Sequence, residues 1–300
     1  MRVLQVDGFP GMRGGQWQVL RLAETLSGLG VESTLLAPAG TPLYELARRR
    51  GLRAEPLGMA RLARLGRRHE LVHAHDARSH TLAALAGGAP LVVSRRVDFA
   101  VGDSAASRWK YGRPRRYIAV SEFVKSVLAK GGVGAEKIDV VYDGVPWLEP
   151  AAPVEPPLIL AADNRGDPLK GAALAVEAAR LAGVEITFSG ELERDLRRAS
   201  LFVYLTKSEG LGSAVLLAMS AGVPVIASDV GGLKEAVAHE ESGLLVENDS
   251  HAIARAIRRL LDDRDAAGRM GRNARQRVAE KFTIDNMARG TLDVYHRVLT

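Results

Sequence analysis

The sequence contains no cysteine among its 300 residues. This absence excludes disulfide bonds, thiolate metal sites and a cysteine nucleophile, and it fits a reducing compartment. The chain also lacks a zinc knuckle, a helix-turn-helix pattern and any basic stretch with interleaved aromatic residues. Apart from its positive charge, nothing in the sequence supports nucleic-acid binding, and we expect no nucleic-acid partner.

Long hydrophobic runs are also absent. The first residues, MRVLQVDGF, have too short an apolar run before Asp7 for a secretion signal and are more typical of a first strand. The longest weakly polar stretch, LAALAGGAPLVV at 82–93, is shorter than the roughly 18 residues that cross a bilayer and contains Gly and Pro. We therefore predict no membrane span and a cytoplasmic location, with association on the inner membrane face as a further hypothesis.

The composition itself is that of a globular protein with unevenly placed charge. With 47% hydrophobic and 25% charged residues in 300, the chain predicts two domains of about 150 residues each. Residues 1–150 carry 22 Lys and Arg against 14 Asp and Glu, a net charge of +8, and the remaining 19 and 21 give −2. The basic excess comes from Arg48, Arg49, Arg50, Arg53, Arg61, Arg64, Arg67, Arg68 and the region Arg95–Arg116.

This basic half has two interpretations. It attracts anionic lipid or a phosphorylated acceptor, or it is simply the solvated surface of an Arg-rich protein. The segment from Arg48 to Arg68 is our candidate for contact with an anionic membrane.

Short apolar runs alternate with helical stretches, which predicts parallel sheets covered by helices on both faces. In the first half, the expected strands are RVLQVD, ESTLLA, LVHAH, PLVVS, RYIAV and IDVVY. Helices are expected near 15–29 and 42–50 and between the last four of these strands. Residues 146–157 hold five prolines in twelve positions and predict an interdomain linker. We therefore expect Rossmann-like domains at 1–150 and 151–283.

The second half repeats this alternation and then becomes purely helical. Expected strands are PLILAA, VEITFS, SLFVYL, VPVIAS and GLLV, with helices near 170–182, 213–221, 232–239, 249–262, 264–280 and 284–298. Ligands of such doubly wound sheets bind at the carboxyl ends of the strands, so these loops are where we look for a site.

The stretch KSEGLG at 207–212 follows one predicted strand and precedes a helix that starts near Ser213. Gly210 and Gly212 let the backbone approach a ligand, and the amides at the start of the helix, around Leu211 and Ser213, carry partial positive charge, which suits a diphosphate. Glu209 beside them is suited to accept hydrogen bonds from sugar hydroxyls. The alternative is that the glycines serve turn geometry and Glu209 caps the helix.

Two cations strengthen the ligand interpretation. NRGDPLKG at 164–171 places Arg165 and Lys170 after the second domain's first strand, at the same predicted sheet edge as Glu209. Two cations and a helix N-terminus that converge describe a diphosphate clamp. Gly231 and Gly232 in VGGLKE open another helix toward the same edge.

These motifs resemble the family 4 glycosyltransferases of the GT-B fold. That family has S-x-x-E-G-x-G, L-E-A-M-A-x-G-x-P-V-V and G-G-x-x-E, and this chain has KSEGLG, LLAMSAGVPVIAS and VGGLKE in the same order. In the first domain, GMRGGQWQVLRLAETLSGLG, ELVHAHD, YIAVSEFV and VVYDGV are similar to family segments. The resemblance therefore covers the whole chain and implies that its last helix, 284–300, packs back on the first domain.

The resemblance implies transfer of a sugar from a nucleotide diphosphate sugar, with retention, without an essential metal or other cofactor, and in cell-envelope glycan or glycolipid synthesis. It places Arg165, Lys170 and the amides of Leu211–Ser213 on the departing diphosphate and Glu209 on the donor sugar. Gly14 and Gly15 would let a first-domain loop close over the phosphates. The implied partners are the donor and a glycan, lipid-linked or phosphorylated acceptor.

The sequence departs from the family pattern at two chemically important positions. The family's second glutamate, eight positions after the first, holds the nucleotide ribose, but here the residue is Leu217, which cannot accept a hydrogen bond. Where the family has a histidine near the reacting centre, this chain has Arg96, with Arg95 and Asp98 beside it. Because arginine is not a base at neutral pH, Arg96 is either a phosphate-binding residue or a plain surface arginine.

Several other interpretations remain open. His73 and His75 in HAHD lie on one side of a strand, as zinc ligands of a hydrolase would, but no second histidine cluster exists. We expect instead that His75 and Asp76 line the acceptor side, with His73 packing or capping. A non-catalytic sugar-nucleotide or glycan binder and a sugar-nucleotide epimerase are alternatives on the same fold.

Overall fold

The computed structural model describes all 300 residues, and its contacts divide the chain into two units. The first comprises Met1–Gly144 and Ile284–Thr300, and the second Val145–Thr283. The boundary precedes the expected one at residue 150, because the Val145 amide donates to Phe282 O at 2.9 Å. The expected linker is not a free connection either, since the amides of Ala151 and Ala152 donate to Ala221 O and Arg197 O, both at 2.8 Å.

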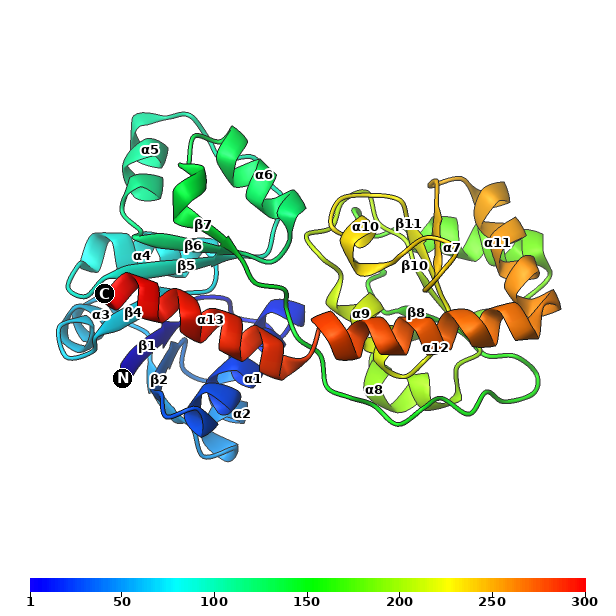
Figure 1. The fold of residues 1–300 in the computed structure, drawn as a ribbon, viewed down its shortest axis with the longest axis horizontal. Helices are drawn as coiled ribbons and strands as arrows, with labels where there is room; N and C mark the ends of the chain where they lie inside the picture. Colours follow the sequence, from blue (N-terminus) through cyan, green and yellow to red (C-terminus); the bar gives the residue numbers. More distant parts are fainter. The chain divides into compact units, whose positions relative to one another are not determined.

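The first unit is a seven-stranded parallel sheet in the order β3-β2-β1-β4-β5-β6-β7 (Figure 1). Its strands are β1 Arg2–Val6, β2 Glu32–Ala37, β3 Arg53–Pro56, β4 Leu71–Ala74, β5 Leu91–Arg95, β6 Arg116–Ala119 and β7 Ile138–Val140. Its helices are α1 Gly14–Gly28, α2 Pro42–Arg49, α3 Met59–Gly66, α4 Ala77–Ala86, α5 Ala105–Gly112, α6 Glu122–Lys130 and α13 Ile284–Leu299, with a 3-10 turn at Ala135–Lys137. The elements β3 and α3 were not predicted.

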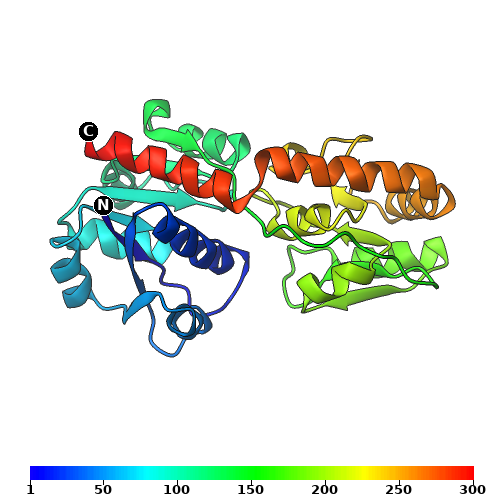
Figure 2. The ribbon, with the colours of Figure 1, turned by 60° about the horizontal axis from the view of Figure 1, so that its bottom comes forward.

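The final helix α13 is part of the first unit and lies beside α1 (Figures 1 and 2). Its residues Met287, Ala288, Val294 and Tyr295 recur at helical spacing and are at most 3% exposed. They pack with Val3, Leu22, Leu26, Val92 and Ile118 into one hydrophobic cluster. This shared core attaches the end of the chain to the sheet that its beginning forms.

The second unit is a five-stranded parallel sheet in the order β12-β11-β10-β8-β9. Its strands are β8 Ile159–Ala162, β9 Ile186–Ser189, β10 Leu201–Tyr204, β11 Val225–Ser228 and β12 Leu244–Val246. Its helices are α7 Ala172–Ala182, α8 Leu192–Asp195, α9 Ser213–Ser220, α10 Leu233–Ala236, α11 Ser250–Asp262 and α12 Arg264–Lys281, with a 3-10 turn at Leu196–Arg198. The helix expected at 232–239 is thus only one turn long.

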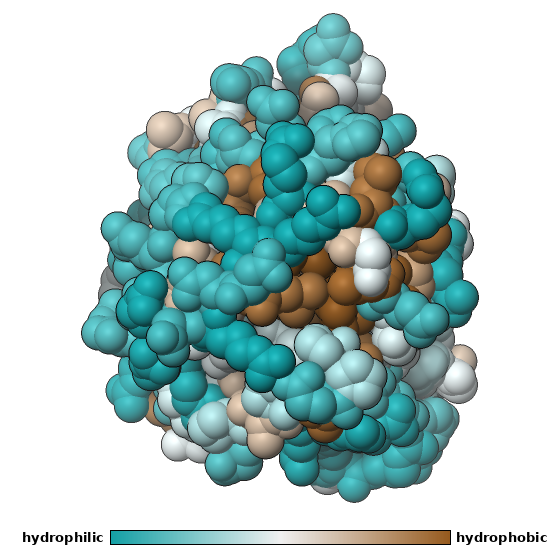
Figure 3. Space-filling model, turned by 90° about the vertical axis from the view of Figure 1, so that its right-hand side faces the viewer, coloured by the Kyte–Doolittle hydropathy of each residue, from teal (hydrophilic) through white to brown (hydrophobic).

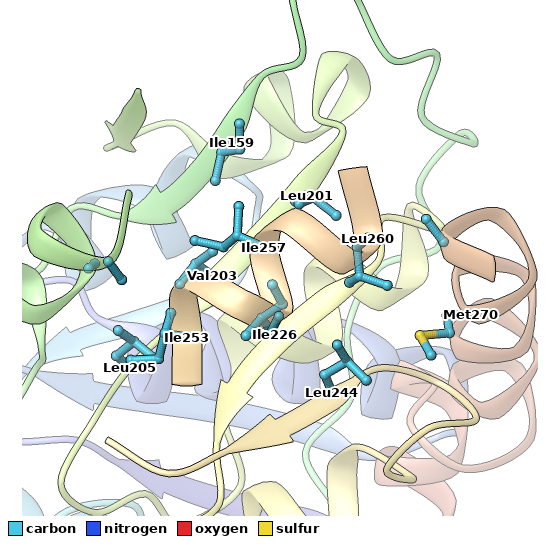
Figure 4. Close-up of a cluster of buried hydrophobic side chains, with 14 residues drawn as sticks. Ile159, Leu201, Val203, Leu205, Ile226, Leu244, Ile253, Ile257, Leu260 and Met270 are labelled. Atoms are coloured by element: carbon cyan, nitrogen blue, oxygen red, sulfur yellow. The ribbon is translucent and has the colours of Figure 1, made fainter. Parts of the chain in front are cut away.

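The core of the second unit lies between its sheet and helices α7 and α11. Figure 4 shows Val203 and Ile226 of adjacent strands facing Ile253 and Ile257 of α11. Partly buried side chains, including Ile186 and Phe188 of the edge strand β9, continue this cluster toward the surface. Figure 3, which shows one face of the molecule, has an apolar area surrounded by hydrophilic residues. The structure contains no helix that could span a bilayer.

Candidate functional site

The loops that follow β8 and β10 meet at one edge of the second sheet, because these strands are neighbours. Lys170 and Thr206 form an isolated antiparallel bridge between the two loops. The Lys170 Nζ atom donates to Glu209 Oε2 at 2.7 Å and to the Tyr204 hydroxyl at 2.8 Å. The Tyr204 hydroxyl in turn donates to Glu209 Oε2 at 2.5 Å. The structure therefore brings Lys170 and Glu209 together and adds Tyr204, which the sequence did not indicate.

These three side chains form a polar cluster that is largely shielded from solvent. The side chains of Lys170 and Glu209 are 19% and 17% exposed. Burial, followed by the Glu209 charge, raises the pKa of Tyr204 well above its usual value. The phenol therefore remains protonated and donates to the carboxylate, while the second Glu209 oxygen accepts from the Gly210 amide at 3.2 Å.

The glycines of KSEGLG shape the backbone between Glu209 and α9. Gly212 has a φ of +95°, a left-handed conformation that favours glycine. The Gly232 amide donates to Glu209 O at 2.9 Å, and a Cβ atom built on Gly232 would overlap the Gly210 carbonyl. Close packing of the two glycine-rich loops thus presents the Ser213 end of α9 next to Glu209.

A second set of polar residues supports this edge. The Thr206 amide donates to Ser228 Oγ at 2.9 Å, Ser228 Oγ donates to Asn248 Oδ1 at 2.6 Å, and Asn248 Nδ2 donates to Thr206 O at 2.9 Å. These residues follow or end β10, β11 and β12. Sequence reasoning missed them, although polar side chains at three strand ends were a usable signal.

Arg165 does not join the cluster around Lys170. Its Nε and Nη2 atoms donate to the two carboxylate oxygens of Asp163 at 2.8 and 2.9 Å, and its side chain is 62% exposed. Its guanidinium lies 5.4 Å from the centre of the Phe188 ring. The two cations therefore do not converge as expected. Lys170 lies beside Glu209, whereas Arg165 pairs with Asp163, two residues away.

A hollow lies beside Lys170, and several of the residues that line it are alanine or glycine. It is lined by Ala161, Ala162, Asn164, Lys170, Gly171, Ala172, Ala175, Phe188, Val203, Tyr204 and Leu205. Leu217 of α9 is not in this lining and is 8% exposed.

The first unit has its own polar cluster at the carboxyl ends of β1, β4 and β5, which are adjacent. Arg96 donates from Nε to Asp143 Oδ1 at 3.0 Å, and these two side chains are 12% and 6% exposed. The interpretation of Arg96 as a plain surface arginine is therefore wrong. Asp143, in the VVYDGV segment, was missed because its partner is 47 residues away.

A chain of buried hydrogen bonds continues from Arg96 to the last helix. Arg96 Nη1 donates to His75 Nδ1 at 3.4 Å, and His75 Nε2 donates to Gln5 Oε1 at 2.7 Å. Gln5 Nε2 donates to the Tyr295 hydroxyl at 3.1 Å, which donates to His73 Nδ1 at 2.7 Å. Burial is the main cause that lowers the pKa of both histidines well below the usual value, so both rings are neutral.

Both histidines therefore form hydrogen bonds with other residues of the first unit. His73 Nε2 completes the chain by donating to Ser94 Oγ at 2.8 Å. No group of three or more His, Asp or Glu side chains in the structure is arranged to hold a metal ion. The zinc-hydrolase alternative consequently lacks a ligand set.

Two carboxylates, Asp7 and Asp76, lie next to this chain of hydrogen bonds. Burial and the neighbouring charge of Asp76 raise the pKa of Asp7 to about 6, while hydrogen bonds from Gln16 and the Phe9 amide oppose the shift. Asp76 caps α4 and also accepts from the Gly8 amide. Asp76, expected on the acceptor side, thus holds two backbone segments at the same sheet edge.

The remaining predicted residues of the first unit lie in loops or at a helix start. Gly14 and Gly15 form the first turn of α1, and a Cβ atom on Gly15 would lie 3.8 Å from Arg96 Cδ. Asp98 is half-buried in the loop after β5. Gly15 is thereby placed close to the Arg96–Asp143 pair.

Two parallel-sheet α/β units, each with polar loops at the carboxyl ends of its strands, define the GT-B class. Residues 12–146 match the sequence profile described as Glycosyltransferase Family 4, and residues 158–277 match the one described as Glycosyl transferases group 1. The chain belongs to the family 4 glycosyltransferases.

Among curated relatives, D-inositol 3-phosphate glycosyltransferase of Streptomyces avermitilis is 44% identical over 100 residues, 33% of this chain and 21% of that protein. Alpha-maltose-1-phosphate synthase of Mycolicibacterium smegmatis is 39% identical over 110 residues, 34% of this chain and 28% of that protein. The matches thus span well under two thirds of either relative's length.

Solved structures show the same fold at low identity. HepE from Anabaena, crystallised with UDP, has a TM-score of 0.88 and 16% identity, covering 99% of this chain and 100% of that chain. Sucrose-phosphate synthase from Thermosynechococcus elongatus has a TM-score of 0.82 and 18% identity, covering 99% and 98%.

Proposed function

We propose that this protein transfers a sugar from a nucleotide diphosphate sugar to an acceptor, with retention at the anomeric carbon and without an essential metal. The observation that carries the proposal is the cluster of Lys170 and Glu209 beside the glycine-rich start of α9. A cation, the amides at a helix start and a carboxylate are the groups that a departing diphosphate and a sugar ring require.

A uridine nucleotide is the best-supported donor. The HepE structures from Anabaena contain UDP, UDP-glucose, or UDP with glucose. This chain offers Lys170 for the diphosphate and Glu209 for sugar hydroxyls, in the loops after two adjacent strands. The inferred substrate is therefore a UDP-sugar, with GDP- and ADP-sugars as the competitors to be tested.

The catalytic contribution that we assign to this site is stabilisation of the leaving group. In the structure Lys170 is bound to Glu209, so an incoming diphosphate would exchange one anionic partner for another. Amides of Leu211–Ser213 would add to the same charge stabilisation, and Glu209 would then be free to accept from the donor sugar. Interactions that strengthen as negative charge develops on the diphosphate accelerate the reaction.

The acceptor is assigned to the first unit. Arg96 is oriented by Asp143 and His75. A guanidinium fixed in this way suits a phosphorylated or otherwise anionic acceptor. Placement of the reaction in envelope glycan or glycolipid synthesis follows from the family resemblance alone.

A second candidate is a non-catalytic sugar-nucleotide binder. It is favoured by Leu217, a buried apolar residue at the position where the family has its ribose-binding glutamate. Because a lost charged hydrogen bond is worth roughly 1.5–3 kcal/mol, this change weakens donor binding without removing the diphosphate contacts.

The test is a thermal-shift screen with UDP, GDP and ADP, followed by transfer assays with the matching sugar nucleotides, with and without EDTA. A nucleotide that binds the native state raises the melting temperature, and NMR of the product reports the anomeric configuration. Turnover that persists in EDTA and retains configuration is expected. Binding without transfer or hydrolysis would favour the second candidate, and the absence of any nucleotide binding would contradict both.

A further inference from the structure

The loop after β5 and the helix α5 expose large apolar side chains. Phe99 is 62% exposed, Trp109 46% and Val97 40%. Helix α5, Ala105–Gly112, buries none of its residues. These three side chains, which we call the α5 face, therefore do not contribute to the core of the unit.

The α5 face is held on a fixed framework. Arg95, at the end of β5 and only 9% exposed, donates from Nε to Val97 O at 3.0 Å and from Nη1 to the Tyr111 hydroxyl at 2.9 Å. Its Nη2 atom donates to Phe99 O. One guanidinium thus ties the loop that carries Val97 and Phe99 to the helix that carries Trp109.

The inner side of α5 has separate anchors. The Tyr117 hydroxyl donates to Tyr111 O at 2.8 Å, the rings of Tyr111 and Tyr117 stack, and Lys110 Nζ donates to Ala77 O at 3.0 Å. Because polar and aromatic contacts attach this side to the unit, the apolar side chains of the α5 face remain available to a partner.

The surroundings of the α5 face are basic. Residues 95–116 contain seven basic side chains against two acidic ones, Asp98 and Asp103. Arg95 is buried, Arg96 pairs with Asp143 and Arg116 pairs with Asp139, so the positive charge of this surface comes from Arg108, Lys110, Arg113 and Arg115. Arg113 lies 5.7 Å from the centre of the Trp109 ring. Exposed aromatic side chains among cations suit a partner that has an apolar interior beneath a negatively charged surface.

The other basic segment is a weaker candidate, because acidic side chains already neutralise part of it. Glu55 lies 3.3 Å from Arg61, 3.7 Å from Arg53 and 3.9 Å from Arg64. Arg50 pairs with Glu24 at 3.1 Å. In addition, α3 exposes only Met59 among its large apolar side chains, at 42%.

We propose that the α5 face docks on the surface of an anionic phospholipid bilayer. Trp109 and Phe99 insert at headgroup level, and Arg108, Arg113 and Arg115 contact lipid phosphates. The inference does not depend on sugar transfer, because it concerns binding alone. If the proposed function also holds, docking brings the first unit to lipid-linked acceptors.

Cosedimentation with vesicles tests the proposal. The protein should bind phosphatidylcholine vesicles that contain phosphatidylglycerol, bind pure phosphatidylcholine vesicles weakly, and lose affinity as salt is added. Trp109→Ala with Phe99→Ser should lower the partition coefficient roughly tenfold or more. Met59→Ser, an exposed apolar residue on α3, is the matched control and should leave binding unchanged.

Fluorescence locates the contact independently of folding effects. The only tryptophans are Trp17, Trp109 and Trp147, so a Trp17→Phe, Trp147→Phe variant reports Trp109 alone. Its emission should shift to the blue on anionic vesicles and be quenched by brominated lipid. Failure to bind anionic vesicles, binding without a change in Trp109 emission, or loss of binding in Arg48→Glu, Arg67→Glu but not in Trp109→Ala would overturn the proposal.

Discussion

Lys170 and Glu209 are 39 positions apart in the sequence, yet Lys170 Nζ lies 2.7 Å from Glu209 Oε2. In this arrangement each group neutralises the charge of the other, and the Tyr204 hydroxyl bonds to both. A diphosphate must therefore compete with Glu209 for the lysine. If it succeeds, the carboxylate is released next to the position where the attached sugar would lie.

Lys170→Met should weaken UDP binding about 10- to 100-fold, because it removes a charge-assisted hydrogen bond worth roughly 1.5–3 kcal/mol. Isothermal titration calorimetry measures the change. Lys207→Met is the matched control, since Lys207 is exposed on the neighbouring loop and should leave the affinity within about twofold. Equal affinities of the two variants would show that Lys170 does not contact the nucleotide.

Leu217→Glu tests whether a carboxylate at this position would bind the ribose of the nucleotide. Because Leu217 is 8% exposed, the new carboxyl group should lower the free energy of unfolding of the unliganded protein by about 1–3 kcal/mol. It should also raise UDP affinity roughly tenfold. The gain should disappear with 2′,3′-dideoxy-UDP. A variant that binds both nucleotides alike would refute a ribose contact at this position, and Leu217→Met controls for side-chain replacement.

Much of the fold follows from the sequence because buried parallel strands are strongly apolar. The predicted strands SLFVYL and VPVIAS contain β10 and β11, and the helix expected at 213–221 corresponds to α9, Ser213–Ser220. In contrast, β3 has the sequence RAEP, lies at a sheet edge and has no fully buried residue. Its pairing with β2 depends on tertiary position, which local hydrophobicity does not encode.

The candidate site could be predicted only where each residue's motif is contiguous. The loop positions of Lys170 and Glu209 were found from KSEGLG and NRGDPLKG, but partners that arrive from elsewhere were not. Arg96 pairs with Asp143 at a separation of 47 residues, and Tyr295 reaches His73 across 222. Such contacts depend on strand order and on the return of α13, neither of which has a local signature.

Gly232→Ala should destabilise the second unit by about 2–4 kcal/mol, because the added Cβ atom would overlap the Gly210 backbone. The two glycine-rich loops should then separate and UDP binding should fall with them. Urea denaturation and UDP titration measure the two effects. Gly190→Ala is the control, since its Cβ atom would meet nothing within 4 Å. Similar stability of both variants would contradict the close packing of the loops.

Asp7 should make stability depend on pH. Its pKa is raised from 3.8 to about 6 in the folded protein, so the folded state holds the proton more tightly than the unfolded state. The contribution of Asp7 to the free energy of unfolding is therefore fully present below about pH 4. As the pH rises through about 6, about 3 kcal/mol of it is lost.

Asp7→Asn cannot ionise and should not undergo this loss. Relative to the unmodified protein, its free energy of unfolding should rise by about 3 kcal/mol between pH 4 and pH 7, as measured by urea denaturation across that range. Asp262→Asn, exposed at the end of α11, measures the effect of removing a surface charge. The contradicting outcome is a difference in free energy of unfolding between Asp7→Asn and the unmodified protein that stays constant with pH. The pKa of Asp7 would then be the same in the folded and unfolded states, and burial beside Asp76 would not raise it.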